Sequence, residues 1–282
     1  MNPTYASFSE EDLKLLDPFL KIGLLATINP DGLPHLTFIS SLRPNTSTQL
    51  TFGQFSEGKS KEYIRQNPKV GFLMMTLQKD LWRGKATFTH TAKQGSEYDY
   101  YNNIPMFRYN SYFGVHTVYY LDLLYHLGRQ PLPMNQIIPA TIMTIVAKTL
   151  SPLRLQNRVF NLWTRQLLTR LDTLKFLAYI DQDGYPMIIP IIQAQPAGFE
   201  HLLFSARVYG TELQQIRYGT PVAILGLALS MEDVLLRGEF LGLQRRAGIL
   251  CGKVKVDWVY NSMPPAPGQI YPPLPLEPVQ DF

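Results

Sequence analysis

An internal repeat constrains the fold of this chain more than any other feature of its sequence. Asp31-Gly32-Leu33-Pro34 is matched by Asp183-Gly184-Tyr185-Pro186, an offset of 152 residues, the difference between 183 and 31. The same offset pairs Leu25-Ala26 with Leu177-Ala178, Phe52 with Phe204, Ile64-Arg65 with Ile216-Arg217, and Val70 with Val222. Arg83-Gly84 matches Arg237-Gly238 two residues further on, and Asp122–Tyr125 resembles Asp257–Tyr260. This constant register predicts two tandem copies of one domain.

Each copy has the pattern of a mainly β domain. An Asp-Gly step between two apolar runs predicts a hairpin, since glycine tolerates the positive φ of a tight turn. A third run follows at 49–55, then a helical pattern at 59–66 that Asn67-Pro68 ends, then strands at 70–77 and 86–91. The copies are therefore predicted to be β-barrels with flanking helices, in two domains, 1–138 and 139–282.

Helices are predicted to lead into both copies. Ser9 is a candidate N-cap before an apolar helix face, and 153–171 has a leucine-rich face in the equivalent place. The opposite face of 153–171 carries arginines and no acid before Asp172. We interpret it as a solvated face, and the alternative is contact with a membrane surface or nucleic acid.

Composition limits the class of protein. The length of 282 residues suits two ordinary domains, and the net charge of +4 suits an anionic ligand as well as nucleic acid. The single cysteine, Cys251, excludes an internal disulfide and fits a reducing cytoplasm. No signal peptide and no apolar run of membrane-spanning length are visible, so we expect a cytoplasmic protein without membrane or nucleic-acid partners.

The stretch 52–60 is the most informative about chemistry. A strand ends at Gly53-Gln54, Ser56 and Gly58 follow, and Lys59-Ser60 begins the predicted helix. A helix N-terminus with unpaired N–H groups and a lysine can bind phosphate. The alternative is a capped surface helix with a solvated lysine.

The ordered set of motifs adds to this reading. A Pro-Asp-Gly-x-Pro-His hairpin, Ser-x-x-Lys before a helix, Asn-Pro-Lys-Val before an apolar strand, and Arg-Gly-Lys-Ala together resemble the pyridoxamine 5′-phosphate oxidase-like flavin-binding split barrels. The resemblance covers 25–86 well and the second copy in part. It implies tandem six-stranded Greek-key split barrels with flavin mononucleotide (FMN) held between two barrels.

The resemblance also implies roles for individual residues. The strand with Thr37, Phe38, Ile39 and Ser40 would lie along the flavin ring. Gly53, Gln54 and Ser56 would lie near the phosphate or ribityl chain, Lys59 and Ser60 would hold the phosphate, and Trp82 and Arg83 would close the site from the partner barrel.

The sequence also departs from the oxidases in this family. Thr37 replaces a phosphate-binding arginine, Leu42 replaces a lysine, and Lys59-Ser60 stands for an Arg-Lys pair. The C-terminal Arg-x-His signature has no counterpart in the proline-rich tail. The chain is therefore not expected to be a pyridoxamine phosphate oxidase itself.

The second copy departs further, since Thr211 stands where Lys59 would be. We expect it to have lost phosphate binding and to supply the other wall of an internal pseudo-dimer. The alternative is a homodimer of whole chains.

The expected function is that of an FMN-dependent oxidoreductase acting on a small molecule, with a nicotinamide or deazaflavin as electron donor. The segment 98–112, with Met106, Phe107 and Arg108, is expected either to form part of the substrate pocket or only to pack. The alternative function is a non-enzymatic flavin or haem carrier or sensor, for which His116 or His126 would be the axial ligand. No metal-binding spacing is present among the histidines.

Overall fold

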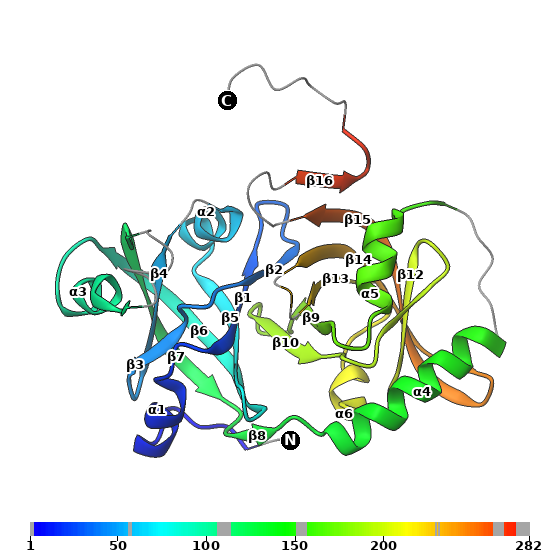
Figure 1. Cartoon of the computed structure of the whole chain (residues 1–282), viewed down its shortest axis with the longest axis horizontal. Helices are drawn as coiled ribbons and strands as arrows, with labels where there is room; N and C mark the ends of the chain where they lie inside the picture. The colour runs from blue at the N-terminus through cyan, green and yellow to red at the C-terminus, as the bar shows by residue number, and fades with distance from the viewer. Residues whose placement is uncertain are drawn as a thin grey trace. The chain divides into compact units, whose positions relative to one another are not determined.

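The chain forms two compact units (Figure 1). The structure is a computed structural model that describes residues 3–55, 58–105, 114–150, 157–228, 230, 232–261 and 268–274. The first unit contains Met1–Leu132 and Ile180–Ile188, and the second contains Pro133–Tyr179 and Ile189–Phe282. The division predicted at 138/139 refers to the repeats rather than to these units, and it stays a prediction.

The first sheet is antiparallel and has eight strands, in the order β2-β1-β5-β6-β7-β4-β3, with β8 paired to β6. Six of the strands are long, and β3 and β8 are short additions at the margins. The strands are β1 (Lys21–Ile28), β2 (Pro34–Phe38), β3 (Arg43–Thr46), β4 (Gln49–Gln54), β5 (Lys69–Thr76), β6 (Asp80–Ala92), β7 (Thr117–His126) and β8 (Gln130–Pro131).

The second sheet repeats this order, β10-β9-β13-β14-β15-β12-β11, with β16 paired to β15. Its strands are β9 (Leu174–Ile180), β10 (Pro186–Pro190), β11 (Gln195–Ala197), β12 (His201–Ser205), β13 (Thr220–Leu227), β14 (Asp233–Arg246), β15 (Ile249–Asn261) and β16 (Gly268–Tyr271). The predicted fold class, mainly β and duplicated, is confirmed.

The strand registers correct one detail of the sequence match. A bulge follows Lys85, whose cross-strand partner is Tyr125, and an equivalent bulge follows Arg237, whose partner is Trp258. Lys85 therefore corresponds to Arg237 at the offset of 152, and the predicted match of Arg83-Gly84 to Arg237-Gly238 is wrong by two residues. The match of Asp122–Tyr125 to Asp257–Tyr260 is shifted by two residues for the same reason. A shared Arg-Gly dipeptide is too short to define register.

The described residues include six helices. They are α1 (Glu10–Leu16), α2 (Lys59–Gln66), α3 (Ser96–Asn103), α4 (Met134–Leu150), α5 (Leu162–Thr169) and α6 (Gly210–Leu213). Ser9 caps α1 as predicted, and its side chain and that of Asp12 form a reciprocal capping box. Within the described ranges, no helix has the length and hydropathy that spanning a membrane requires.

The region 128–151 contains the division between the two units, after Leu132, and the division predicted after residue 138. It contains α4, a helix of 17 residues with Pro139 in its interior. Ile137, Ala140, Thr144 and Ala147 are its buried residues, at the spacing of one helix face. Tertiary packing of this face outweighs the local effect of the proline.

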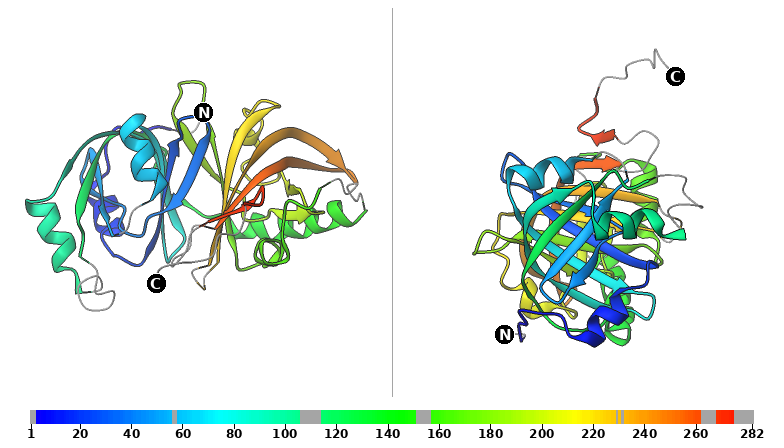
Figure 2. Two further views of the ribbon diagram at one scale, coloured as in Figure 1. Left: turned by 90° about the horizontal axis from the view of Figure 1, so that it is seen from above. Right: turned by 90° about the vertical axis from the view of Figure 1, so that its left-hand side faces the viewer.

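The core of the first unit lies between its sheet and its first two helices. A single buried cluster includes Leu25 of β1, Phe52 of β4, Ile64 of α2, Val70 of β5 and Trp82 of β6. The cluster places α2 beside β1 and β2, as Figure 2 shows. The apolar residues that define the sequence repeat are therefore the ones that fix the position of α2.

Candidate functional site

The predicted phosphate site lies at the beginning of α2. The helix begins at Lys59, after Gly58, whose backbone is extended and which forms no side-chain cap. Within this turn the Lys61 N–H donates to the Gly58 carbonyl at 3.1 Å. The beginning of a helix also attracts an acceptor from outside the helix. Lys59 is exposed at this end of the helix, and Ser56 lies outside the described residues. This end of α2 combines the positive end of a helix dipole with an ammonium group.

Two predicted residues meet here. The hydroxyl groups of Thr37, near the end of β2, and of Ser60, in the first turn of α2, are hydrogen-bonded to each other. Ser60 is buried and Thr37 is half-buried. On the inner side of α2, His35 of β2 lies edge-on to the ring of Tyr63, with centroids 5.2 Å apart. The contact between β2 and α2 thus places two hydroxyl groups beside the first turn.

Ile39, another predicted residue, forms a backbone hydrogen bond just beyond β2. The N–H of Ile39 donates to the carbonyl of Gly23 at 2.7 Å, which extends the β1–β2 pairing beyond the end of β2. Ile39 is buried, whereas Phe38 and Ser40 are half-buried. The Ile39 N–H is therefore used within the sheet, and β2 is the edge strand, paired to β1 on one side.

Gly53 is bound by Ser41. The Ser41 hydroxyl donates to the Gly53 carbonyl at 3.0 Å and accepts from the Gly53 N–H at 3.1 Å. A Cβ added at Gly53 would lie 2.8 Å from a methyl group of Val115. Close packing therefore explains the glycine without a ligand.

Gln54 ends a polar chain that leads back to α2. Its Oε1 accepts from the Tyr119 hydroxyl at 3.0 Å, and that hydroxyl accepts from Arg65 Nη2 at 2.8 Å. Arg65 is on α2, and sequence reasoning missed its role. The Arg65–Tyr119–Gln54 chain holds α2 against β4 and β7.

Trp82 and Arg83 are fully buried. The Trp82 indole N–H donates to Asp12 of α1 at 2.8 Å. Arg83 donates to the carbonyl of Ile188 at 3.3 Å and to Gln130 at 3.4 Å. These contacts hold the two residues against elements other than α2.

Sequence reasoning also missed a buried ion cluster in the first unit. The Lys85 side chain is 1% exposed, and its ammonium donates to Asp181 at 2.7 Å and to both oxygens of Asp183 at 2.8 and 2.9 Å. Burial acts to lower the pKa of Lys85, but the bonds to Asp181 and Asp183 outweigh it and raise that pKa. The sequence contains one indirect indication of this cluster. The Asp-Gly hairpin recurs at 183–184, and the chain also contains Arg-Gly-Lys-Ala.

The candidate haem ligands are placed differently from each other. His126 is buried, with Nε2 2.9 Å from the Ser7 carbonyl and Nδ1 accepting from the Gly128 N–H at 3.1 Å. Both nitrogens of His126 are therefore occupied in this conformation, whereas His116 is exposed with Nδ1 2.8 Å from the Thr117 hydroxyl. Among the described residues, no three of His, Cys, Asp and Glu are grouped as metal ligands.

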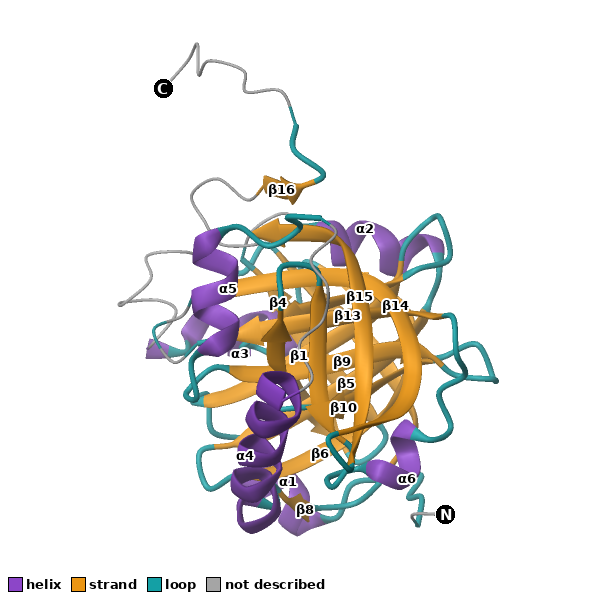
Figure 3. Cartoon of the chain, turned by 90° about the vertical axis from the view of Figure 1, so that its right-hand side faces the viewer, coloured by secondary structure: helices purple, strands orange, loops and turns teal. Residues whose placement is uncertain are grey.

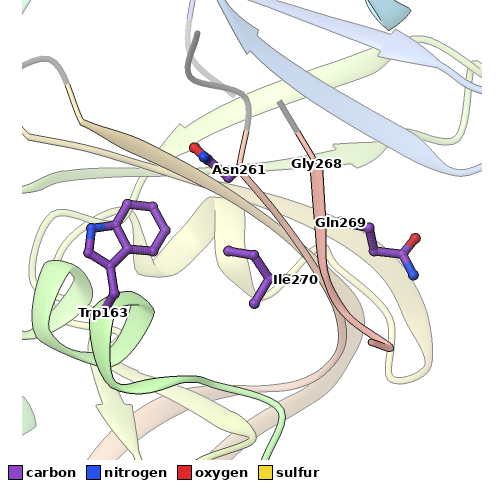
Figure 4. A pocket seen from close by; sticks show the side chains of 5 residues that line it. All are labelled: Trp163, Asn261, Gly268, Gln269 and Ile270. Atoms are coloured by element: carbon purple, nitrogen blue, oxygen red, sulfur yellow. The ribbon is translucent and has the colours of Figure 1, made fainter. Parts of the chain in front are cut away.

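The second unit contains a cavity of about 390 Å³. Its lining residues are Trp163, Asn261, Gly268, Gln269 and Ile270. Figure 4 shows Trp163 of α5 and Ile270 of β16 on either side of the space, with Gln269 directed away from Trp163. Gln269 accepts from the Trp258 indole at 2.8 Å. The lining side chains carry no charge, so the cavity does not suit a phosphate group.

This chain is similar to several solved structures, whereas its sequence matches no known family or curated protein. No protein-family profile and no curated protein sequence matches this chain. One similar solved structure is a putative pyridoxamine 5′-phosphate oxidase from Lactobacillus delbrueckii, at 20% identity and a TM-score of 0.34, covering 43% of this chain and 94% of that one.

Two further structures have comparable scores. One is an FMN-binding protein from Syntrophomonas wolfei, at 13% identity and a TM-score of 0.35, covering 43% of this chain and 84% of that one. The other is HupZ from Group A Streptococcus, at 16% identity and a TM-score of 0.34, covering 41% of this chain and 89% of that one. Each of these three structures matches less than half of this chain. At these identities the likeness concerns the fold alone.

Proposed function

We propose that the first unit binds FMN by its phosphate group at the beginning of α2, as part of an FMN-dependent oxidoreductase that acts on a small molecule. The observation that carries the proposal is the meeting of the Thr37 and Ser60 hydroxyl groups beside the exposed Lys59. Hydroxyl groups, first-turn N–H groups and an ammonium are the donors that a phosphate dianion accepts from.

The rest of the FMN molecule has fewer candidate partners among the predicted residues than its phosphate group has. Gly53 and Gln54 use polar atoms within the protein, so contacts to the ribityl chain would come from other groups. Bound flavin would supply two-electron chemistry, with a nicotinamide or deazaflavin as donor. The residues at α2 would anchor and orient it: Lys59 by charge and Ser60 by its hydroxyl, which Thr37 holds in place.

The first test is the absorbance spectrum of the purified protein. Bands at ~370 and ~450 nm that pass a filter after denaturation indicate a non-covalent flavin, and its ratio to protein gives the number of sites. A Soret band would favour haem and His116. A colourless protein that takes up no added FMN would contradict the proposal.

The second test isolates the phosphate. Lys59→Ala is expected to weaken FMN binding by about tenfold or more, because a charge-assisted hydrogen bond is lost, and to leave riboflavin binding unchanged, since riboflavin has no phosphate. Thr211→Ala is the matched control, at the equivalent exposed position of the second copy. An equal loss of affinity for both flavins, or no loss for FMN, would show that Lys59 does not bind the phosphate. Flavin binding without turnover of any donor would favour a carrier or sensor.

A further inference from the structure

The outward face of α4 is mostly apolar from Ile138 to Leu150, with Thr149 as an exposed polar residue. Ile138, Ile142 and Leu150 are 57%, 59% and 68% exposed, and Ile145 and Val146 between them are also exposed. These five residues, named here the α4 stripe, recur at the i, i+4 and i+7 spacing of one helix face. Aliphatic side chains left in water forgo the favourable free energy of their burial. A contiguous apolar face of this kind marks an interaction surface.

The orientation of α4 is fixed by its other face. Ala147 packs with Leu203 and Cys251, and the Thr144 hydroxyl accepts from the Ser205 N–H at 2.9 Å. Thr144 and Ala147 thus face β12 and β15, on the helix face that also holds buried Ile137, and the α4 stripe faces outward. The stripe is not a misplaced core face, because rotating the helix would break these contacts.

The surroundings of the stripe are cationic. No Asp or Glu occurs between residues 134 and 171, whereas Lys148, Arg158 and Arg165 do. Arg158 and Arg165 lie over the same Phe199 ring, 5.7 and 4.9 Å from its centroid. Lys148 donates to Gln195 at 3.4 Å, and its pKa is lowered by burial and by the charge of Arg165. Figure 3 shows α4 and α5 along the same flank of the second sheet.

The strand beneath α4 adds to this charge. The pKa of Lys253, on β15, is lowered by burial and then by Arg246, with Lys255 acting in the same direction. The acids near these cations are Glu200, which is buried at 2% exposure, and Glu239 and Asp257, which lie beside Lys255. Arg170 is set apart, since Asp172 and Glu232 neutralise it. The flank around the stripe therefore presents cations and few carboxylates.

We propose that this flank of the second unit docks on an anionic lipid surface. α4 would lie in the plane of the interface, with the α4 stripe at the headgroup–acyl boundary and the cations on lipid headgroups. The positive charge of the flank identifies the binding partner among the alternatives. A second copy docked through the same face would bring like charges together, and nucleic acid does not complement a row of aliphatic side chains. The inference revises the expectation of no membrane partner.

The proposal is tested by co-sedimentation of the full chain with vesicles of phosphatidylcholine, with and without phosphatidylglycerol. Binding is expected only to the anionic vesicles, and added salt should reduce it. The variant with Ile138→Ser, Ile142→Ser and Leu150→Ser should bind more weakly by about tenfold or more. Arg165→Gln with Lys253→Gln should weaken binding roughly fivefold for each charge removed.

Leu20→Ser with Leu77→Ser is the control, because these leucines of the first unit are 62% and 66% exposed. It should bind as the wild type does, and circular dichroism should show that every variant is folded. Absence of binding to anionic vesicles, or an equal loss in the control, would overturn the proposal. It would equally be overturned if size-exclusion chromatography gave a wild-type dimer that the stripe variant makes monomeric, without vesicle binding.

Discussion

Between β4 and β5 the first unit carries α2, eight residues long, whereas the equivalent connection of the second sheet carries α6, four residues long. The strands on both sides keep the same order and register. Only the longer helix has an exposed lysine at its beginning and a hydroxyl group of the neighbouring strand beside it. The two units therefore share the strand framework and differ in the connections between the strands.

A second difference lies between the last two long strands. In the first unit α3 lies between β6 and β7, whereas Ala247-Gly248 turns directly from β14 into β15. Each unit nevertheless covers the same pair of strands: α3 packs on β4 and β7, and α4 packs on β12 and β15. The apolar face of these strands needs a cover, and helices from different parts of the chain provide it.

Replacing Gly71 by alanine should have the largest effect on the comparison. A Cβ at Gly71 of β5 would lie 2.4 Å from the backbone oxygen of Pro186, in the 180–188 hairpin. The equivalent residue of the second sheet is already alanine, Ala223. We expect Gly71→Ala to lower the free energy of unfolding by about 3 kcal/mol through overpacking, and Ala223→Gly by less than about 1 kcal/mol.

Urea unfolding of the first unit, followed by the fluorescence of buried Trp82, measures this difference. Trp163 and Trp258 lie in the second unit, so their emission needs to be separated by Trp→Phe variants. Equal effects of the two substitutions would show that the 180–188 hairpin does not pack closely against Gly71.

Replacing Lys85 by methionine should have the next largest effect. The change leaves Asp181 and Asp183 without their buried cation, and we expect a loss of about 2 kcal/mol, less than for a fully buried pair because both carboxylates are partly exposed. Arg237→Met, at the equivalent position, removes a guanidinium 3.7 Å from the Trp258 ring centroid and should cost about 1 kcal/mol. Adding Asp181→Asn and Asp183→Asn to Lys85→Met should recover part of the loss.

The same cluster predicts a pH window. Burial acts to raise the pKa of Asp183, but its bonds with Lys85 and the Tyr185 N–H outweigh this and hold the pKa below 3.8. Its contribution is complete above pH 3.8 and is lost as the pH falls through the lowered value. The raised pKa of Lys85 gives a contribution that is complete below pH 10.5 and is lost above it. A Lys85→Met protein whose stability falls as steeply in acid as that of the wild type would contradict this assignment.

The local elements could be predicted well from the sequence, and particular residues show why. Pro68 ends α2, the apolar run after it forms β5, and Asp31-Gly32 forms the first hairpin, in which Gly32 has a φ of 75°. Each of these effects acts within a few residues, so the pattern carries it.

Contacts over long separations could not be predicted in this way. Lys85 meets Asp181 across 96 residues, and nothing local to either residue indicates the pairing. The buried face of α4 also depends on such contacts, since Thr144 and Ala147 pack on β12 and β15. At the candidate site, Thr37 and Ser60 were each named, but the Arg65–Tyr119–Gln54 chain depends on three elements meeting in space.

Replacing Lys175 by methionine should stabilise the second unit. Lys175 is buried on β9, where the first sheet has Gly23, and its ammonium has only carbonyl contacts of 3.3 and 3.4 Å among those described. Burial lowers its pKa from 10.5 to about 8. The unfolded chain therefore binds more protons between pH 8 and 10.5, so the stability of the wild type should rise over that range.

Lys175→Met should add about 1 to 2 kcal/mol at neutral pH and remove most of this rise. Lys21 has a similarly lowered pKa of about 8, chiefly through burial, but it donates to the Pro18 carbonyl at 2.8 Å. Lys21→Met should therefore gain less. A destabilised Lys175→Met protein would mean that the two carbonyl contacts outweigh the buried charge.

The caps of α1 and α5 provide the smallest and most symmetric test. Ser9 and Asn161 are 152 residues apart, the difference between 161 and 9, and both cap the helix that precedes a first strand. Ser9 accepts from the Asp12 N–H at 3.1 Å, and Asn161 accepts from the Thr164 N–H at 2.7 Å. We expect Asn161→Ala to lower the free energy of unfolding by about 1 kcal/mol. Ser9→Ala should cost slightly less, because the Asp12 carboxylate still accepts from the Ser9 N–H. Thermal unfolding of each variant beside the corresponding glycine variant measures both effects. A loss of stability at only one of these two positions would show that one unit holds its entry helix by packing alone. The two units would then differ in the helices that begin each repeat as well as in their connections.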